Sequence, residues 1–249
     1  MSDVLPFPNP PITEAIFDIK VNLPKETTLE SLFLYQKNIN DRFPKKVNRR
    51  KMEGGFQFSD GLEPKVLSPK DEVYGYHFVA SDDSKIVQAR LDGFTFNKLK
   101  PYSDWDQFSG EAMELWQKFI PIAKPERVNR LSLRYINRIE LPLPFFDLKE
   151  FILTGPELAS NLNLSLAQFF IRMIIPDASI GAFAIVTEAI EDEDKTKNVL
   201  PLIFDIDVIQ NVNLDPKSPE IFETMKRLRD FKNKLFLESL TDMAKELFK

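Results

Sequence analysis

The amino-acid sequence predicts an α+β fold of mainly antiparallel sheet, with two helices in the N-terminal half and a long amphipathic C-terminal helix packed on the sheet. Three observations lead to this prediction: period-two alternation of apolar residues over 11–23, an Asp92-Gly93 pair between two strand-like runs, and an apolar stripe over 218–248. Such alternation is typical of a strand with one buried face, and Asp-Gly between strands is a strong hairpin signal.

The N-terminal segment, residues 1–141, is predicted to form a strand–helix–strands–helix–strand lobe. Its first strand covers 11–23, with Ala15, Phe17, Ile19, Val21 and Leu23 on one face. A Thr27-x-x-Glu30 capping box then opens a helix, and Pro44 marks its end.

Turn residues in the segment 45–70 predict short strands between turns. The second helix begins at Ser103 or Asp104 and ends at Pro121, and a strand follows over 128–142. Between these segments, aromatic and β-branched runs predict an antiparallel meander of three strands, at 73–79, 85–91 and 94–99. This order of elements suits helices packed on one face of a sheet.

The C-terminal segment, residues 142–249, is expected to fold together with the first. A short helix is predicted over 147–153, and the final helix over 218–248, long enough at 1.5 Å per residue to span roughly 45 Å. Three strands lie between them, at 164–176, 181–191 and 200–210, with the acidic run 191–194 in the last turn.

The composition excludes several classes of site. The chain has no cysteine, so it has no disulfide, thiolate nucleophile or iron–sulfur cluster, and its single histidine, His77, cannot form a multi-histidine metal site. The sequence has no Walker-type loop and no GxGxxG, GxSxG or HExxH motif. We therefore expect no cofactor, no metal and no catalytic residue. These missing residue types and motifs together favour a protein that is not an enzyme.

The charge and the N-terminal sequence bear on partners and compartment. The net charge of −5 disfavours binding of nucleic acid or anionic membrane by the molecule as a whole. The N-terminus has no basic region followed by an apolar one, and no apolar stretch has the length of a spanning helix. We expect a cytoplasmic protein without a membrane partner.

The strand at 130–141 carries the main candidate binding site. Side-chain parity places Arg130, Arg134 and Arg138 on one face, at steps of about 13 Å for a strand rise of 3.3 Å per residue. Guanidinium groups suit carboxylate or phosphate, so these arginines, together with Asn137, are assigned as an anion- or partner-binding site. The alternative, the more common arrangement on a sheet face, is that the arginines pair with acids of neighbouring strands.

A second basic patch follows the first predicted helix. It is expected to be a loop that offers its charges to an acidic partner or, as the only route to nucleic acid, to a phosphate backbone. A solvated loop explains the same pattern, because Phe43 is the only aromatic residue within it. The patch consists of Arg42, Lys45, Lys46, Arg49, Arg50 and Lys51.

Two further hypotheses stay open. Asp205 and Asp207 share a strand face, and with Arg134 they could serve a metal-dependent hydrolase or nuclease. A sheet covered by a long helix can also enclose a cavity, so the chain could carry an apolar or anionic small ligand. His77 has no Ser, Cys or metal motif beside it, which leaves a general-base role unsupported.

Two blocks of the sequence carry a resemblance. PPITEAIFDI near the N-terminus and RLSLRYINRIELP in the middle resemble the signature blocks of a sporadically distributed prokaryotic family of uncharacterised proteins of this length, and RDFKNKLFLESLTD is similar to the family's usual ending. The resemblance implies a bacterial protein of an accessory locus, of the defence or toxin–antitoxin kind. It implies no catalytic residue. Together with the residue patterns, it favours a non-catalytic binding or regulatory protein that contacts a protein partner.

Overall fold

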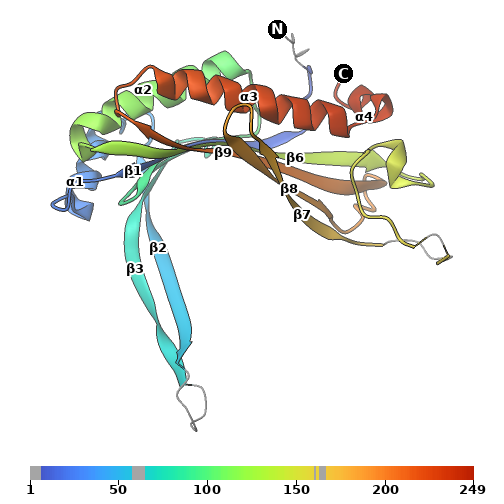
Figure 1. Cartoon of the computed structure of the whole chain (residues 1–249), viewed down its shortest axis with the longest axis horizontal. Coiled ribbons are helices and arrows are strands. Elements are labelled where there is room, and N and C mark those ends of the chain that lie inside the picture. The colour runs from blue at the N-terminus through green and yellow to red at the C-terminus, as the bar shows by residue number, and fades with distance from the viewer. Residues whose placement is uncertain (1–6, 58–64, 160, 163–166) are drawn as a thin grey trace.

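The computed structural model describes residues 7–57, 65–159, 161–162 and 167–249, and for 51–57 and 65–71 it describes the backbone alone. Within these residues, nine strands form one antiparallel sheet in the order β2-β3-β4-β5-β1-β6-β9-β8-β7 (Figure 1). The strands are β1 (Ile12–Asn22), β2 (Lys45–Gln57), β3 (Lys65–Val79), β4 (Lys85–Arg90), β5 (Gly93–Leu99), β6 (Arg127–Pro142), β7 (Phe170–Asp177), β8 (Ala182–Ile190) and β9 (Val199–Leu214).

The strand β6 lies in the interior of this sheet, next to the central strand β1. It pairs with β1 on one side and with β9 on the other, so strands from both predicted segments share one sheet. The predicted α+β class with antiparallel sheet is confirmed.

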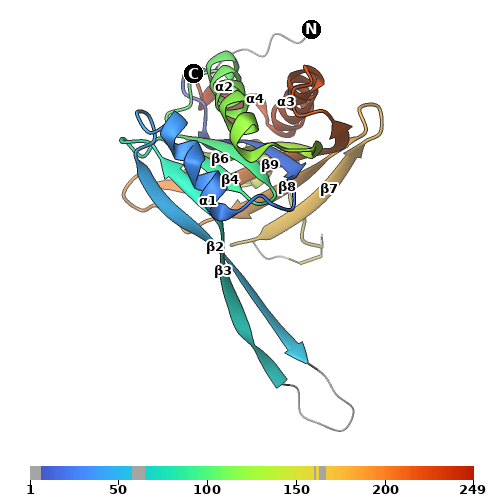
Figure 2. The ribbon, with the colours of Figure 1, turned by 90° about the vertical axis from the view of Figure 1, so that its left-hand side faces the viewer.

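The helices lie on one face of the sheet. They are α1 (Leu29–Phe33), α2 (Trp105–Ala123), α3 (Glu220–Ser239) and α4 (Asp242–Glu246), with 3₁₀ turns η1 (Leu34–Asn38) and η2 (Leu148–Glu150). Helices α2, α3 and α4 run along this covered face, and no helix in the described part of the chain crosses the other, open face (Figures 1 and 2). None of the helices in the described ranges is long and apolar enough to cross a membrane.

The hydrophobic core fills the space between the covered face and the helices. Strand parity explains its composition, because alternate residues of each strand point to the helices. On β1 these residues are Ala15, Phe17, Ile19 and Val21, all buried as the alternation predicts. Aromatic rings dominate the contact with α2, where Phe94 packs on Trp116 and Phe119.

The hairpin of β2 and β3 forms an arm on the open side of the sheet. Strand β4 pairs with β3 only over Gly75–Val79, whereas β2 and β3 pair with each other along almost their whole length. The hairpin therefore continues beyond the sheet and extends away from the helices (Figures 1 and 2). The prediction of short strands between turns is wrong for this segment, although its Asp60-Gly61 turn lies outside the described residues.

The first helix is shorter than predicted. It ends at Phe33 and continues as the 3₁₀ turn η1, which still buries Tyr35. Its capping box is Thr28 with Ser31 instead of Thr27 with Glu30, because the Thr28 hydroxyl accepts from the Ser31 amide and the Ser31 hydroxyl accepts from the Thr28 amide.

The later helices also differ from their predicted bounds. Asp104 caps α2 as expected, but the helix continues past Pro121 to Ala123. The C-terminal helix is confirmed as far as Ser239, after which Leu240 becomes extended and bridges Ile152. A separate short helix, α4, then follows.

Candidate functional site

The three predicted arginines of β6 all lie on the open face. Each contacts an acid: Arg130 Nη2 lies 3.2 Å from Asp18, Arg134 donates to Asp205 at 2.8 and 2.5 Å, and Arg138 donates to Glu191 at 2.9 Å. Their side chains remain 32%, 40% and 30% exposed, respectively. The structure thus has both features considered from the sequence, a shared arginine face and pairing with neighbouring acids.

Asn137 lies apart from these arginines, on the covered face. It is buried, and its side-chain amide donates to the carbonyl of Phe204 at 2.9 Å. Parity along β6 requires this placement, because odd-numbered residues of 131–141 point toward the helices. The structure therefore does not bring Asn137 together with the arginine face.

The basic run 42–51 is not a loop, because β2 begins at Lys45. Its first three cations each contact a different group of residues. Arg42 pairs with Glu111 and Glu114 of α2, and Lys45 lies 2.8 Å from Asp83. Lys46 packs over the rings of Phe33 and Tyr76. The side chain of Lys51 lies outside the described part of the structure.

Arg49 and Arg50 instead line the open face together with Arg130 of β6. At the base of the arm they meet Arg130 around a depression of about 400 Å³ on the open face, which we call the ionic cleft. The cleft is lined by five cations and two carboxylates, a net charge of +3; its residues are Asp18, Lys20, Arg49, Arg50, Tyr74, Arg90, Asp92 and Arg130. Parts of both sequence-predicted patches thus form one site.

Asp18 is the acid at the centre of the ionic cleft. Its Oδ1 accepts from Arg90 at 2.8 Å and from Thr95 at 2.7 Å, and its Oδ2 faces Arg130. Asp18 and Arg90 are both buried. Buried charges are tolerated when they are paired and hydrogen-bonded in this way, so the network fixes the positions of both guanidinium groups.

The second acid of the ionic cleft, Asp92, remains ionised over the physiological range. Burial acts to raise its pKa, but the hydrogen bond from Tyr74 and the charge of Arg90 outweigh burial and lower the pKa to about 2. Burial, together with the Asp92 bond, raises the pKa of Tyr74 to about 12, so the phenol stays protonated. The positive excess of the cleft is therefore not removed by titration of either group.

The aspartates of the hydrolase hypothesis engage different partners. Asp205 accepts both bonds from Arg134, whereas Asp207 accepts from Ser132. Burial raises the pKa of Asp207, against the hydrogen bond from Ser132. Among the described residues, no group of three or more His, Cys, Asp or Glu side chains is placed to hold a metal ion.

His77 lies on the open face, opposite Gln88 in the strand register. Burial lowers its pKa, and the positive charges of Arg49 and Arg90 lower it further. The imidazole is therefore neutral at pH 7, and it contributes no charge to the neighbouring cleft.

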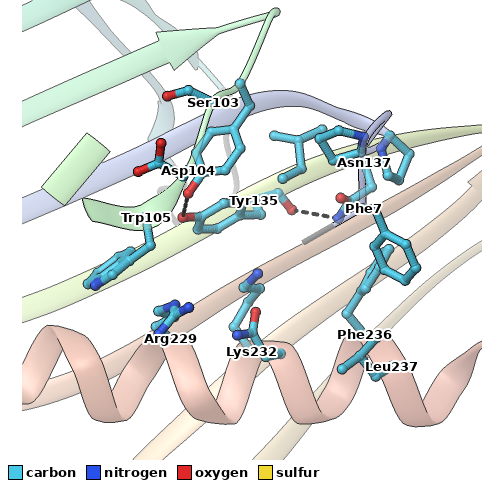
Figure 3. A pocket seen from close by; sticks show the side chains of 15 residues that line it. Phe7, Ser103, Asp104, Trp105, Tyr135, Asn137, Arg229, Lys232, Phe236 and Leu237 are labelled. Atoms are coloured by element: carbon cyan, nitrogen blue, oxygen red, sulfur yellow. Dashed lines mark hydrogen bonds between the residues drawn. The ribbon is translucent and has the colours of Figure 1, made fainter. Parts of the chain in front are cut away.

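A second site lies beneath α3, where a cavity under the long helix was one of the open hypotheses, although no residue was assigned to it from the sequence. A cavity of about 160 Å³ separates α3 from β6, and we call it the α3 cavity (Figure 3). Lys232 and Arg229 enter it from α3, facing Tyr135 of β6 (Figure 3). A signal for it exists in the sequence, because Lys232 interrupts the apolar stripe of the helix between Leu228 and Phe236.

The comparisons with protein families and with curated proteins found no relative of this chain. No protein-family model matches the chain, and no curated protein matches it. The resemblance of the PPITEAIFDI and RLSLRYINRIELP blocks to a prokaryotic family therefore stays a prediction, as does the genomic context that it implies.

Proposed function

We propose that this protein is a non-catalytic binding protein that holds an acidic segment of a protein partner in the ionic cleft. The observation that carries this proposal is the excess of five cations over two carboxylates in one depression on an otherwise acidic molecule. Guanidinium groups recognise carboxylates through paired hydrogen bonds, and a cleft that concentrates one sign of charge attracts ligands of the other sign.

The position of the ionic cleft favours a macromolecular partner. The cleft lies where the arm leaves the sheet, and the open face continues beyond it across β6 and β9 (Figure 1). An extended segment bound there would contact the cleft at one end and the strand face at the other. The sheet therefore offers more contact area than a free anion requires.

The surroundings of the ionic cleft favour a short acidic peptide over nucleic acid. Acids line the open face beside it, with Glu14 on β1 and Asp205 on β9 both opposite Ile136 of β6, and with Asp207 next to them on β9. A continuous phosphate backbone would pass over these acids, whereas a peptide with two or three carboxylates would occupy the cleft alone. The basic run does not extend the positive surface, since Arg42 and Lys45 pair with acids elsewhere.

Fluorescence anisotropy with a labelled hexaglutamate peptide tests this proposal. The wild type should bind the peptide at low salt, and binding should weaken as the salt concentration rises. Arg49→Gln/Arg130→Gln should weaken binding by at least about tenfold, because two charge-assisted contacts are lost.

A matched control removes two cations from the helix side. Lys118→Gln/Arg227→Gln changes the net charge equally, and both side chains are partly exposed and ion-paired on α2 and α3. Its affinity for the peptide should equal that of the wild type. Equal loss in both double variants, or tighter binding of a single-stranded oligonucleotide than of the peptide, would contradict the proposal.

A further inference from the structure

The α3 cavity combines an apolar wall with two cations. Phe7 and Phe236 form one end of it, and Trp105 lies at the other (Figure 3). Lys232 and Arg229 are three residues apart on α3, so their side chains share one face of the helix. Both enter the cavity that Tyr135 closes from the sheet side (Figure 3).

Lys232 is the buried cation of the cavity. It is only 8% exposed, and its Nζ lies 3.9 Å from the centroid of the Tyr135 ring. Within the part of the chain that the structure describes, no hydrogen bond or ion pair reaches this ammonium. A buried ammonium without a counter-ion is costly, so this site is unfavourable for the protein unless something else satisfies it.

The neighbouring polar groups do not neutralise Lys232. Arg229 adds a second positive charge and lies 5.4 Å from the Trp105 ring. Tyr102 and Tyr135 hydrogen-bond to each other at 2.9 Å, and burial raises the pKa of both phenols, that of Tyr102 to about 12. Asp104, the one carboxylate among the described residues lining the cavity, accepts from the Gln107 amide at the start of α2.

We propose that the α3 cavity binds a small organic monocarboxylate, with its carboxylate between Lys232 and Arg229 and its apolar body against Phe7 and Phe236. An anion supplies the counter-charge that the described surroundings of Lys232 lack. The apolar wall selects against inorganic anions, which would lose their hydration without gaining apolar contact.

The size of the cavity limits the ligand. A cavity of about 150 Å³ accommodates one benzene-sized molecule, and the α3 cavity is of about 160 Å³. The ligand body is therefore one ring or a branched chain of similar volume. A neutral molecule of the same shape would leave both cations without a partner, and an amine would repel them.

Binding should also be coupled to protonation of Lys232. In the free protein, burial and then the charge of Arg229 lower its pKa to about 7. A bound carboxylate favours the ammonium, so the complex takes up a proton, and affinity should fall as the pH rises above about 7. The other groups facing the amine are Arg229 on α3, Tyr135 on β6, and Tyr102 and Asp104 ahead of α2, and both phenols stay protonated in this range.

Isothermal titration calorimetry with benzoate, cyclohexanecarboxylate and isovalerate as probes tests the proposal. At least one should bind saturably to the full chain, and the neutral isostere of the best probe, benzamide in the case of benzoate, should bind at least about tenfold more weakly. At pH 8, titrations in buffers of different ionisation enthalpy should reveal uptake of up to one proton per ligand.

Two lysine variants separate a specific contact from a general charge effect. Lys232→Met keeps the length of the side chain and should lose at least about tenfold in affinity together with the proton uptake. Lys226→Met is the matched control, because Lys226 is on the same helix and also packs over a ring, that of Phe222, but is exposed to solvent and paired with Glu223. Binding to this control should equal that of the wild type.

Three results would overturn the proposal. One is the absence of saturable binding of all three carboxylates at millimolar concentration. The second is equal affinity for a carboxylate and its neutral isostere. The third is retention of wild-type affinity by Lys232→Met, whose folded state is checked by thermal unfolding in the same buffer.

Discussion

Buried charges on the two faces of the sheet differ in whether they have an ion-pair partner. On the open face, Asp18 and Arg90 are buried but lie in contact with each other, and Arg130 and Thr95 complete the network. On the covered face, Lys232 and Glu188 are buried, and neither forms an ion pair within the described part of the chain. The charges of the open face therefore support the fold as a set, whereas those of the covered face act against it.

This difference separates two kinds of candidate site. In the ionic cleft the buried Arg90 already contacts two carboxylates, so a bound acid adds to an existing network and contributes steering and selectivity. In the α3 cavity a ligand removes a defect of the free protein, so its binding should stabilise the fold as well. Substitutions on each face should distinguish the two cases by the sign of their effect on stability.

The largest expected effect is on the covered face. Lys232→Met should raise the free energy of unfolding by about 4 kcal/mol at pH 7, because the folded state lowers the pKa of this amine from 10.5 to about 7. The unfolded chain binds more protons between these values, so the stability of the wild type rises with pH over this range. The advantage of the variant should therefore shrink as the pH increases from about 7 toward 10.

Urea denaturation at several pH values measures this effect. The comparison is between the wild type and Lys232→Met, with Lys226→Met as the exposed control on the same helix. A loss of stability in Lys232→Met at pH 7, or a gain that does not depend on pH, would show that the ammonium has a counter-charge in the free protein.

The open face should respond with the opposite sign. Asp18→Asn preserves the shape of the side chain but leaves Arg90 and Arg130 without their shared carboxylate. Removal of one partner of a buried ion pair lowers the free energy of unfolding by about 3 kcal/mol or more. Because Asp92 still contacts Arg90 in this variant, we expect a loss of about 3 kcal/mol.

An exposed pair provides the comparison for this substitution. Asp83 contacts Lys45 at the sheet end with a side chain that is 71% exposed, so Asp83→Asn should change the urea midpoint little. Equal midpoints for the wild type and Asp18→Asn would mean that the network of the ionic cleft does not stabilise the fold.

The sequence predicted the features that depend on local pattern. Alternation identified the buried face of β1, and parity placed Arg130, Arg134 and Arg138 together on the open side of β6. Both predictions need only the geometry of a single strand. The hairpin of β4 and β5 likewise follows from the residues at Asp92-Gly93.

The features that depend on tertiary contacts could not be predicted in this way. The apolar stripe of the C-terminal segment continues through Leu240 and Ala244, which are both buried, so periodicity alone cannot reveal the break between α3 and α4. The break coincides with the bridge of Leu240 to Ile152 and the hydrogen bond from Thr241 to the carbonyl of Glu150.

Both candidate sites depend on strand order in the same manner. Arg49 and Arg130 meet in the ionic cleft although they lie on β2 and β6, with four strands between these in the sheet. Tyr102, Tyr135 and Lys232 meet in the α3 cavity from three separate parts of the chain. Composition and spacing identify such residues as candidates, but only the topology shows which of them share a site.

The smallest of the expected effects concerns the other buried charge of the covered face. Glu188 is 0% exposed, and its Oε1 accepts from Thr154 at 2.8 Å while its Oε2 has no hydrogen-bond partner within the described residues. Burial raises its pKa to about 6, against the effect of the Thr154 bond. The folded state therefore binds more protons than the unfolded chain between about pH 4.5 and 6, and stability falls as the pH rises through this window.

Glu188→Gln should consequently be more stable than the wild type by about 2 kcal/mol at pH 7.5, and equal to it at pH 4, as measured by urea denaturation. Thr154→Val removes a hydrogen bond that favours the ionised carboxylate, so it should move the pH-dependent loss of stability to higher pH. If Glu188→Gln gained nothing at pH 7.5, a cation would have to reach Glu188 in solution, and the contrast between the two faces would hold for Lys232 alone.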